Sequence, residues 1–162
     1  ALHPQPKNKN GGAAAVENNV IISIKGMQSY IGMDSDAIEL VTEGRFDQED
    51  AGCYTLSYQE SELTGLGGTL TTFQIEPKRV TLLRVGEFNS QMVFQEGRQH
   101  LALYDTPYGA LSVAVRTKKM QTCLDPTGGK IEVDYAIEID HAAAGESLFR
   151  IQVRKKPALP QS

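Results

Sequence analysis

The sequence contains no tryptophan, only two cysteines and three histidines, and no long apolar run. A transmembrane helix needs about 20 consecutive apolar residues, so we expect no membrane span. Secreted disulfide scaffolds are far richer in cysteine, so Cys53 and Cys123 predict reduced thiols and a cytoplasmic protein, although their positions leave a disulfide between them open. No histidine spacing typical of zinc ligands, no nucleotide-binding lysine motif and no nucleophile elbow occurs. We therefore expect no metal, no cofactor and no catalytic residue.

Positive charge is also scarce. The 16 Lys and Arg are outnumbered by 20 Asp and Glu, which gives a formal net charge of −4. Nucleic acids and anionic membrane surfaces are bound mainly through basic patches, and the basic residues here are scattered. Aromatic residues make up 7% of the chain, too few to predict a base-stacking platform. We expect neither a nucleic acid nor a membrane as partner, whereas a homodimer stays open.

Composition divides the chain into three parts. Residues 1–19 contain two prolines, four asparagines and a Gly-Gly pair without apolar periodicity, which predicts a flexible leader. Residues 157–162 predict a short C-terminal tail. Residues 20–156 carry the pattern of one folded domain, and a chain of this length can bury a sizeable core without disulfides.

Within this domain, apolar and polar residues alternate with the two-residue period of a β-strand. The clearest segment is 131–140, where one parity is apolar or aromatic and the other is acidic apart from one alanine. Successive side chains of a strand point to opposite faces, so we expect a buried face and a solvated acidic face. Helical periodicity is not sustained, with room for at most one helical turn near 119–124. Strands are predicted near 20–28, 38–46, 53–60, 70–76, 79–86, 88–95, 98–106, 111–119, 131–140 and 147–154.

Short connections between successive strands favour an up-and-down meander. An open sheet of so many strands would leave two exposed edges, and closure removes them. The sequence thus predicts an all-β protein that forms a single antiparallel up-and-down β-barrel of about 8–10 strands. Gly26 and Gly44 fall inside predicted strands, where glycine typically marks a bend or bulge.

Several short motifs carry a family resemblance through their order and spacing. They are Tyr58-Gln59-Glu60, Thr64 to Thr69, Arg84-Val85-Gly86, Met92-Val93-Phe94, Tyr104 to Gly109, and Thr117. Over about residues 20–153 the chain resembles the YwiB-like family of bacterial proteins, a domain of unknown function. The resemblance implies a calycin-like barrel, similar in architecture to lipocalins, and it implies no established activity.

Glu60 is the most informative polar residue. It shares its parity with the apolar side chains of the preceding strand, so it should face the interior near a strand end. A buried carboxylate needs a partner. Arg84 shares its parity with Val80 and Leu82, although the opposite parity of that strand is equally apolar. We predict a Glu60–Arg84 pair, which either is structural or lets Arg84 bind a ligand carboxylate or phosphate inside the barrel.

Three tyrosines, Tyr58, Tyr104 and Tyr135, are expected to point inward, where they either fill the core or line a pocket with polar groups. Thr117 is a weaker candidate of the same kind. The glycine-rich segment 64–69 lacks the lysine and the following helix of a phosphate-binding loop. We interpret it as a hairpin or mouth loop, with a lid over the barrel as the alternative.

A closed barrel of this size can hold one small ligand, so we expect a non-catalytic module that binds a small, largely apolar or amphipathic ligand. The alternative is a packed barrel that acts through its outer surface as a protein-interaction or regulatory module. An enzyme has the least support, because no nucleophile and base can be paired from their spacing. The candidate binding residues are Tyr58, Glu60, Arg84, Tyr104, Thr117 and Tyr135.

Overall fold

The computed structural model describes residues 17–30, 36–106 and 109–157. The leader and tail expected at the two ends therefore lie mostly outside the described residues. In these ranges the chain forms ten β-strands and a short 3-10 helix, η2 (Glu62–Thr64). The strands are β1 (Val20–Tyr30), β2 (Asp36–Asp50), β3 (Cys53–Gln59), β4 (Thr69–Glu76), β5 (Arg79–Gly86), β6 (Ser90–Phe94), β7 (Gln99–Thr106), β8 (Gly109–Asp125), β9 (Gly128–Ile139) and β10 (Ala142–Lys155).

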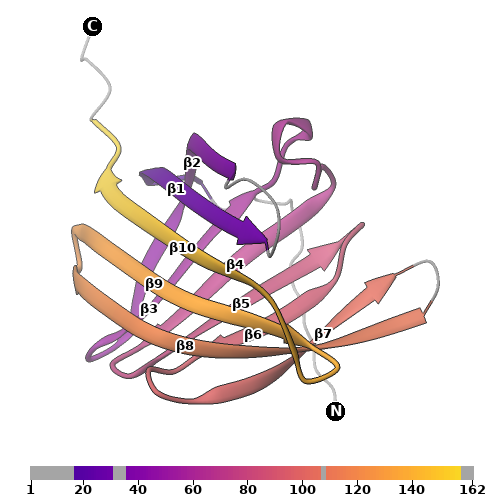
Figure 1. Cartoon of the computed structure of the whole chain (residues 1–162). Coiled ribbons are helices and arrows are strands. Elements are labelled where there is room, and N and C mark those ends of the chain that lie inside the picture. Colours follow the sequence, from indigo (N-terminus) through magenta and orange to yellow (C-terminus); the bar gives the residue numbers. More distant parts are fainter. Residues whose placement is uncertain (1–16, 31–35, 107–108, 158–162) are drawn as a thin grey trace, which may run out of the picture.

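The strands form one closed antiparallel barrel. Each strand pairs with its neighbours in sequence, and β1 closes the barrel on β10, with β8, β9 and β10 crossing the front of Figure 1. This arrangement confirms the predicted all-β, up-and-down barrel. The segment 119–124, where a helical turn could fit, is strand instead: it is the C-terminal part of β8 and pairs with β9.

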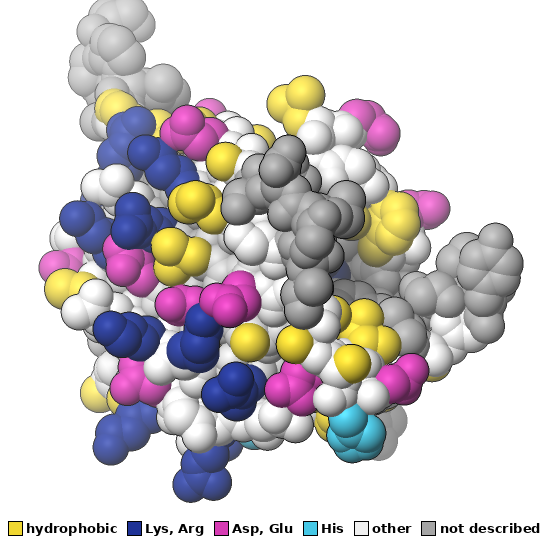
Figure 2. Space-filling model, in the orientation of Figure 1, with side chains coloured by type: hydrophobic (Ala, Val, Ile, Leu, Met, Phe, Trp, Pro, Cys, Tyr) yellow, Lys and Arg dark blue, Asp and Glu magenta, His cyan; other side chains and the backbone are white. Residues whose placement is uncertain are grey.

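Alternation along β9 separates the interior from the solvent. Ile131, Val133 and Tyr135 are buried inside the barrel. The acidic side chains between them point outward and pair with basic residues of neighbouring strands, as between Glu132 and Arg150. Figure 2 shows Lys and Arg interleaved with Asp and Glu over the face of β8, β9 and β10. The acidic parity is therefore a solvated face, as the sequence predicts.

One end of the barrel is tightly packed. Tyr54 helps to cap this end, because its ring stacks on Phe46 at 5.3 Å and its hydroxyl donates to the Leu124 carbonyl at 3.4 Å. Burial of apolar side chains here supplies the main driving force for folding. Fully buried side chains that fill the interior toward this end include Ile22, Leu56, Ile75, Val80, Phe94, Val115 and Ile131.

The opposite end is the mouth, and β2 opens it by changing its partner at Gly44. Residues 36–44 pair with β1, whereas residues 45–50 pair with β3. A Cβ at Gly44 would collide with the Ile22 side chain and the Ser57 carbonyl, so only glycine fits this bend. As a result, the first half of β2 has no ladder to β3 in the described chain. The bend expected at Gly26 is absent, because this residue pairs regularly with both β10 and β2.

Candidate binding site

A cavity of about 410 Å³ lies inside the mouth of the barrel. Small-molecule sites range from roughly 300 to 1,000 Å³, so the cavity suits a small ligand. The β3–β4 connection contributes Leu63, Thr64 and Leu66 to its lining, which places the predicted mouth loop at the opening. Most of the wall is apolar and comes from β1, β2, β4, β5, β9 and β10. Its apolar residues are Ile24, Ile38, Leu40, Phe73, Leu82, Phe149 and Ile151.

Aromatic rings form one side of the cavity. Phe149 lies 6.0 Å from Phe73 and 6.2 Å from Tyr135, measured between ring centroids. Phe94, which is fully buried, packs against both Tyr135 at 4.9 Å and Phe149 at 5.5 Å. Tilted and edge-to-face contacts at such distances are favourable and fix ring positions. The aromatic wall is therefore rigid, and the packed core continues behind it.

The polar side of the cavity is built around Glu60, which directly follows β3. Its side chain is 1% exposed. Thr71 donates a hydrogen bond to Glu60 Oε2 at 2.5 Å, and Thr64 donates one to Oε1 at 2.8 Å. The Tyr58 hydroxyl interacts electrostatically with the same carboxylate. Hydrogen bonds to an ionised acceptor are strong, so the carboxylate is held in place although it is buried.

Arg84 reaches the same site from β5, where it is the cross-strand partner of Thr71. Its Nε lies 3.9 Å from Glu60 Oε2, so the predicted pair is present as an ion pair. The distance is too long for a hydrogen bond. Nε is buried and has no hydrogen-bond partner in the described part of the chain, while the whole side chain is 26% exposed. The guanidinium charge is therefore balanced, but this donor is left for a ligand or water.

Tyr58 joins this group from β3 and lines the same cavity. Burial raises the pKa of its hydroxyl well above the ordinary value, the negative charge of Glu60 raises it further, and the positive charge of Arg84 partly opposes the rise. The hydroxyl therefore stays protonated at neutral pH, where it can serve as a hydrogen-bond donor.

Four of the residues predicted from the sequence line this cavity: Tyr58, Glu60, Arg84 and Tyr135. Thr117 is buried elsewhere. Its hydroxyl accepts a hydrogen bond from the backbone of Gln95 at 3.2 Å, which supports the turn between β6 and β7. The side chain of Tyr104, the sixth candidate, lies outside the described residues.

Sequence reasoning missed Thr64 and Thr71, which hold the carboxylate. The signal for Thr71 was present, because the two-residue turn between β4 and β5 pairs Glu76 with Arg79 and therefore Thr71 with Arg84. Thr64 carried no such signal, since its position depends on the η2 connection.

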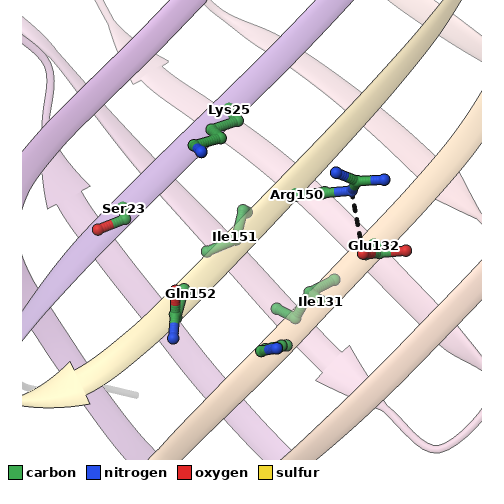
Figure 3. Close-up of a pocket in the computed structure, with 8 residues that line it drawn as sticks. Ser23, Lys25, Ile131, Glu132, Arg150, Ile151 and Gln152 are labelled. Carbon is green, nitrogen blue, oxygen red and sulfur yellow. Dashed lines mark ion pairs between the residues drawn. The ribbon is translucent and has the colours of Figure 1, made fainter.

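A second depression, of about 220 Å³, lies on the outer face of β1, β10 and β9 (Figure 3). Lys25, Arg150 and Glu132 line it, together with Ser23, Lys130 and Gln152. Arg150 pairs with Glu132 at 3.0 Å, and Lys25 pairs with Glu39 at 3.6 Å. These groups are largely solvated and carry little interaction energy. The surface lacks the buried, unpartnered donor that distinguishes the mouth cavity.

The described residues contain no group of three or more His, Cys, Asp or Glu side chains that could hold a metal ion. Cys53 and Cys123 are free thiols. No helix within the described ranges is long and apolar enough to cross a bilayer.

Comparison with known families places this barrel among its relatives. The profile of a domain of unknown function, DUF1934, matches residues 22–151, which is most of the chain. The chain belongs to the DUF1934 family. It is similar to the uncharacterized beta-barrel protein YwiB of Bacillus subtilis (strain 168), with 26% identity over 123 residues that cover 76% of this chain and 84% of YwiB.

Solved structures confirm the fold of this DUF1934 protein. The crystal structure of YwiB from Bacillus subtilis aligns with a TM-score of 0.74 at 21% identity, and the alignment covers 86% of this chain and 93% of that one. The two proteins therefore share the barrel fold. The S-type phycobiliprotein lyase CPES from Guillardia theta aligns with a TM-score of 0.34 at 10% identity over 86% of this chain and 88% of that one, which is too low to establish a common fold.

Proposed function

We propose that this DUF1934 barrel is a non-catalytic module that binds a small, largely apolar ligand in its mouth, with the polar end of the ligand against Arg84. One observation carries the proposal: the buried Nε of Arg84 lacks a hydrogen-bond partner among the described residues, and the Arg84 side chain lines a cavity of about 410 Å³. Leaving a buried donor unsatisfied costs about 1–3 kcal/mol. A ligand acceptor at Nε would recover that cost.

The distribution of side chains supports an amphipathic ligand. The charged pair and Tyr58 lie on one arc of the barrel, at β3 and β5, which flank β4, whereas the opposite arc contributes Gln28 and Tyr135 as its polar groups. The opposite arc, formed by β1, β2, β9 and β10, offers mainly apolar side chains such as Leu40 and Phe149. The calycin-like architecture implied by the family resemblance agrees with this role by analogy, since barrels of this kind can enclose one small ligand.

The state of the polar groups favours binding over catalysis. The Glu60 side chain is almost fully buried and both of its oxygens already accept hydrogen bonds, so it is poorly placed to take a proton from a substrate. The raised pKa of Tyr58 keeps its hydroxyl protonated at neutral pH, so no phenolate is available as a base or nucleophile. Both side chains are better suited to holding Arg84 than to chemistry.

The test uses a probe of known structure together with a variant that fills the cavity. Gly26 lines the cavity, and a Cβ built there meets no atom within 4 Å, so Gly26→Phe should place its ring in the cavity. The matched control is Ser23→Phe, which adds the same ring to the outer face of the same strand. The probe is prodan, a neutral naphthalene ketone whose fluorescence shifts to the blue in apolar sites.

We expect one-to-one binding of prodan by the wild type and by Ser23→Phe, and at least tenfold weaker binding by Gly26→Phe, with all three proteins folded by circular dichroism. Native mass spectrometry of the protein from its own host should show a bound small molecule that Gly26→Phe lacks. Equal binding of prodan by Gly26→Phe would place the probe outside the cavity. No probe and no co-purified mass in the wild type would refute the proposed function.

A second candidate function is partner binding through the outer surface, favoured by two neighbouring outward side chains of β7. Leu101 is 72% exposed and Leu103 is 60% exposed. Exposed apolar side chains that cluster on one face are common at interaction surfaces. Cross-linking that captures the same partner with the wild type and with Gly26→Phe, but not with Leu101→Asp, would favour this function over ligand binding.

A further inference from the structure

The cavity lining is electrically balanced before any ligand enters. Among the described lining residues, Glu60 and Arg84 are the carboxylate and the guanidinium, the two groups that carry a formal charge at neutral pH, and they form one ion pair. Their opposite charges sum to zero. A charged ligand would therefore find no unpaired charge of opposite sign among the described lining residues.

The charge of Glu60 cannot move away to make room for an anion. Its side chain is buried, and Thr71 and Thr64 hold both of its oxygens. A ligand oxygen accepting a hydrogen bond from Arg84 Nε at about 2.9 Å would lie no more than about 7 Å from Glu60 Oε2, because Nε is itself 3.9 Å from that oxygen. Two carboxylates so close together in a poorly solvated site disfavour each other's ionised form. A phosphate monoester, which carries more negative charge at neutral pH, is opposed more strongly.

A neutral acceptor avoids this repulsion and still uses what Arg84 offers. A carbonyl oxygen can accept a hydrogen bond from the unpartnered Nε, and hydrogen bonds from a charged donor are stronger than those between neutral groups. A neutral head also loses far less hydration on entering an apolar cavity than an ion does. We propose that the polar end of the ligand is an uncharged hydrogen-bond acceptor, such as an amide, ester or ketone, rather than a carboxylate or phosphate. This inference rests on the proposed function.

Glu60 is then a specificity-determining and positioning residue. It does not contact the ligand, but it neutralises Arg84 and so rejects anions that an isolated arginine would attract. If Glu60 sets specificity in this way, its removal should change which ligands bind, whereas removal of a purely structural partner should change only stability. Removing the negative charge of Glu60 while keeping its shape should turn the site toward anions, because Arg84 would then hold an unbalanced positive charge.

The experiment compares two ligands that differ only in their head group, 6-(dimethylamino)-2-naphthamide and 6-(dimethylamino)-2-naphthoate, each titrated directly at pH 8. The variants are Glu60→Gln and the matched control Glu62→Gln. The control removes the same charge from an exposed position on η2, outside the cavity lining. Prodan binding, measured alongside, reports whether the cavity binds apolar ligands at all.

We expect the wild type and Glu62→Gln to bind the amide at least tenfold more tightly than the carboxylate, and Glu60→Gln to reduce that ratio at least tenfold. The inference is overturned if the wild type binds the carboxylate as tightly as the amide, or if a folded Glu60→Gln keeps the wild-type ratio. If Glu60→Gln does not fold, the wild-type ratio decides alone. In these cases prodan still binds and the proposed function stands, whereas absence of both prodan binding and a co-purified small molecule refutes the function itself.

Discussion

Replacing Arg84 by methionine should strongly destabilise the barrel, because it leaves the buried Glu60 carboxylate without a counter-charge. At the observed 3.9 Å, two unit charges attract each other by about 4 kcal/mol at an effective dielectric constant of 20. Removing one member of a buried pair typically costs 3–5 kcal/mol. Because the Arg84 side chain is 26% exposed, the lower end applies, and we expect a loss of about 3 kcal/mol from Arg84→Met.

A second substitution should partly reverse this loss. In the double variant Glu60→Gln/Arg84→Met no charge remains buried, and the glutamine oxygen can still accept a hydrogen bond from Thr71 or Thr64. We therefore expect the double variant to be about 1–2 kcal/mol more stable than Arg84→Met alone, even though it lacks one more native group.

Urea unfolding followed by circular dichroism measures both effects, with the free energy of unfolding taken from the midpoint at constant slope. Arg79→Met is the matched control, because Arg79 is exposed at the other end of the same strand and should change stability by less than about 0.5 kcal/mol. A loss below about 1 kcal/mol for Arg84→Met, or a double variant less stable than Arg84→Met, would contradict the charge-balance argument.

Three further predictions follow from single residues. Burial raises the pKa of Tyr58, so the folded barrel keeps this hydroxyl protonated at a pH where an unfolded tyrosine ionises. The free energy of unfolding should therefore fall as the pH rises above about 10. Tyr58→Phe should flatten that fall, measured by urea unfolding at several pH values between about 8 and 11. His141 holds a positive φ of 65° in the β9–β10 turn, so His141→Gly should stabilise the protein by about 1 kcal/mol and raise its Tm. Gly44→Ala should lower the free energy of unfolding by at least about 2 kcal/mol, because the new methyl group collides with neighbouring backbone. Gly26→Ala, whose methyl group meets open space, should cause no measurable loss of stability. Thermal unfolding of both variants measures the difference.

The two-residue alternation predicted the all-β barrel well, because strands such as β3, β4 and β9 have one buried and one solvated face. It was weaker at strand ends. A strand was predicted over residues 111–119, whereas the structure shows the much longer β8. A bulge next to Lys118 reverses which side chains face inward, so the alternation of apolar and polar residues in the sequence is interrupted there. A local pattern cannot reveal such a bulge, since the extra residue is positioned by the register with β9 rather than by its own neighbours.

The candidate site was predictable in part for the same reason. Parity indicated that Glu60 faces inward, but it left two equal options for Arg84, because both faces of β5 are apolar. Pairing decides between them: opposite Arg84 stands Thr71, on the parity of buried Phe73 and Ile75. Register therefore carries information that composition does not, and the turn between β4 and β5 makes that register available from sequence.

The emptiness of the mouth depends on Gly26, which occupies an inward position where other strands place large side chains. It pairs with Phe149 on one side and Ile38 on the other, and its missing side chain leaves space between them. A larger residue there would bury more apolar surface and favour folding. A barrel that acted only through its outer surface would lose nothing from that substitution. An unfilled inward position and an arginine Nε without a hydrogen-bond partner among the described residues occur in the lining of the same cavity, and this combination supports the proposed ligand over a packing defect.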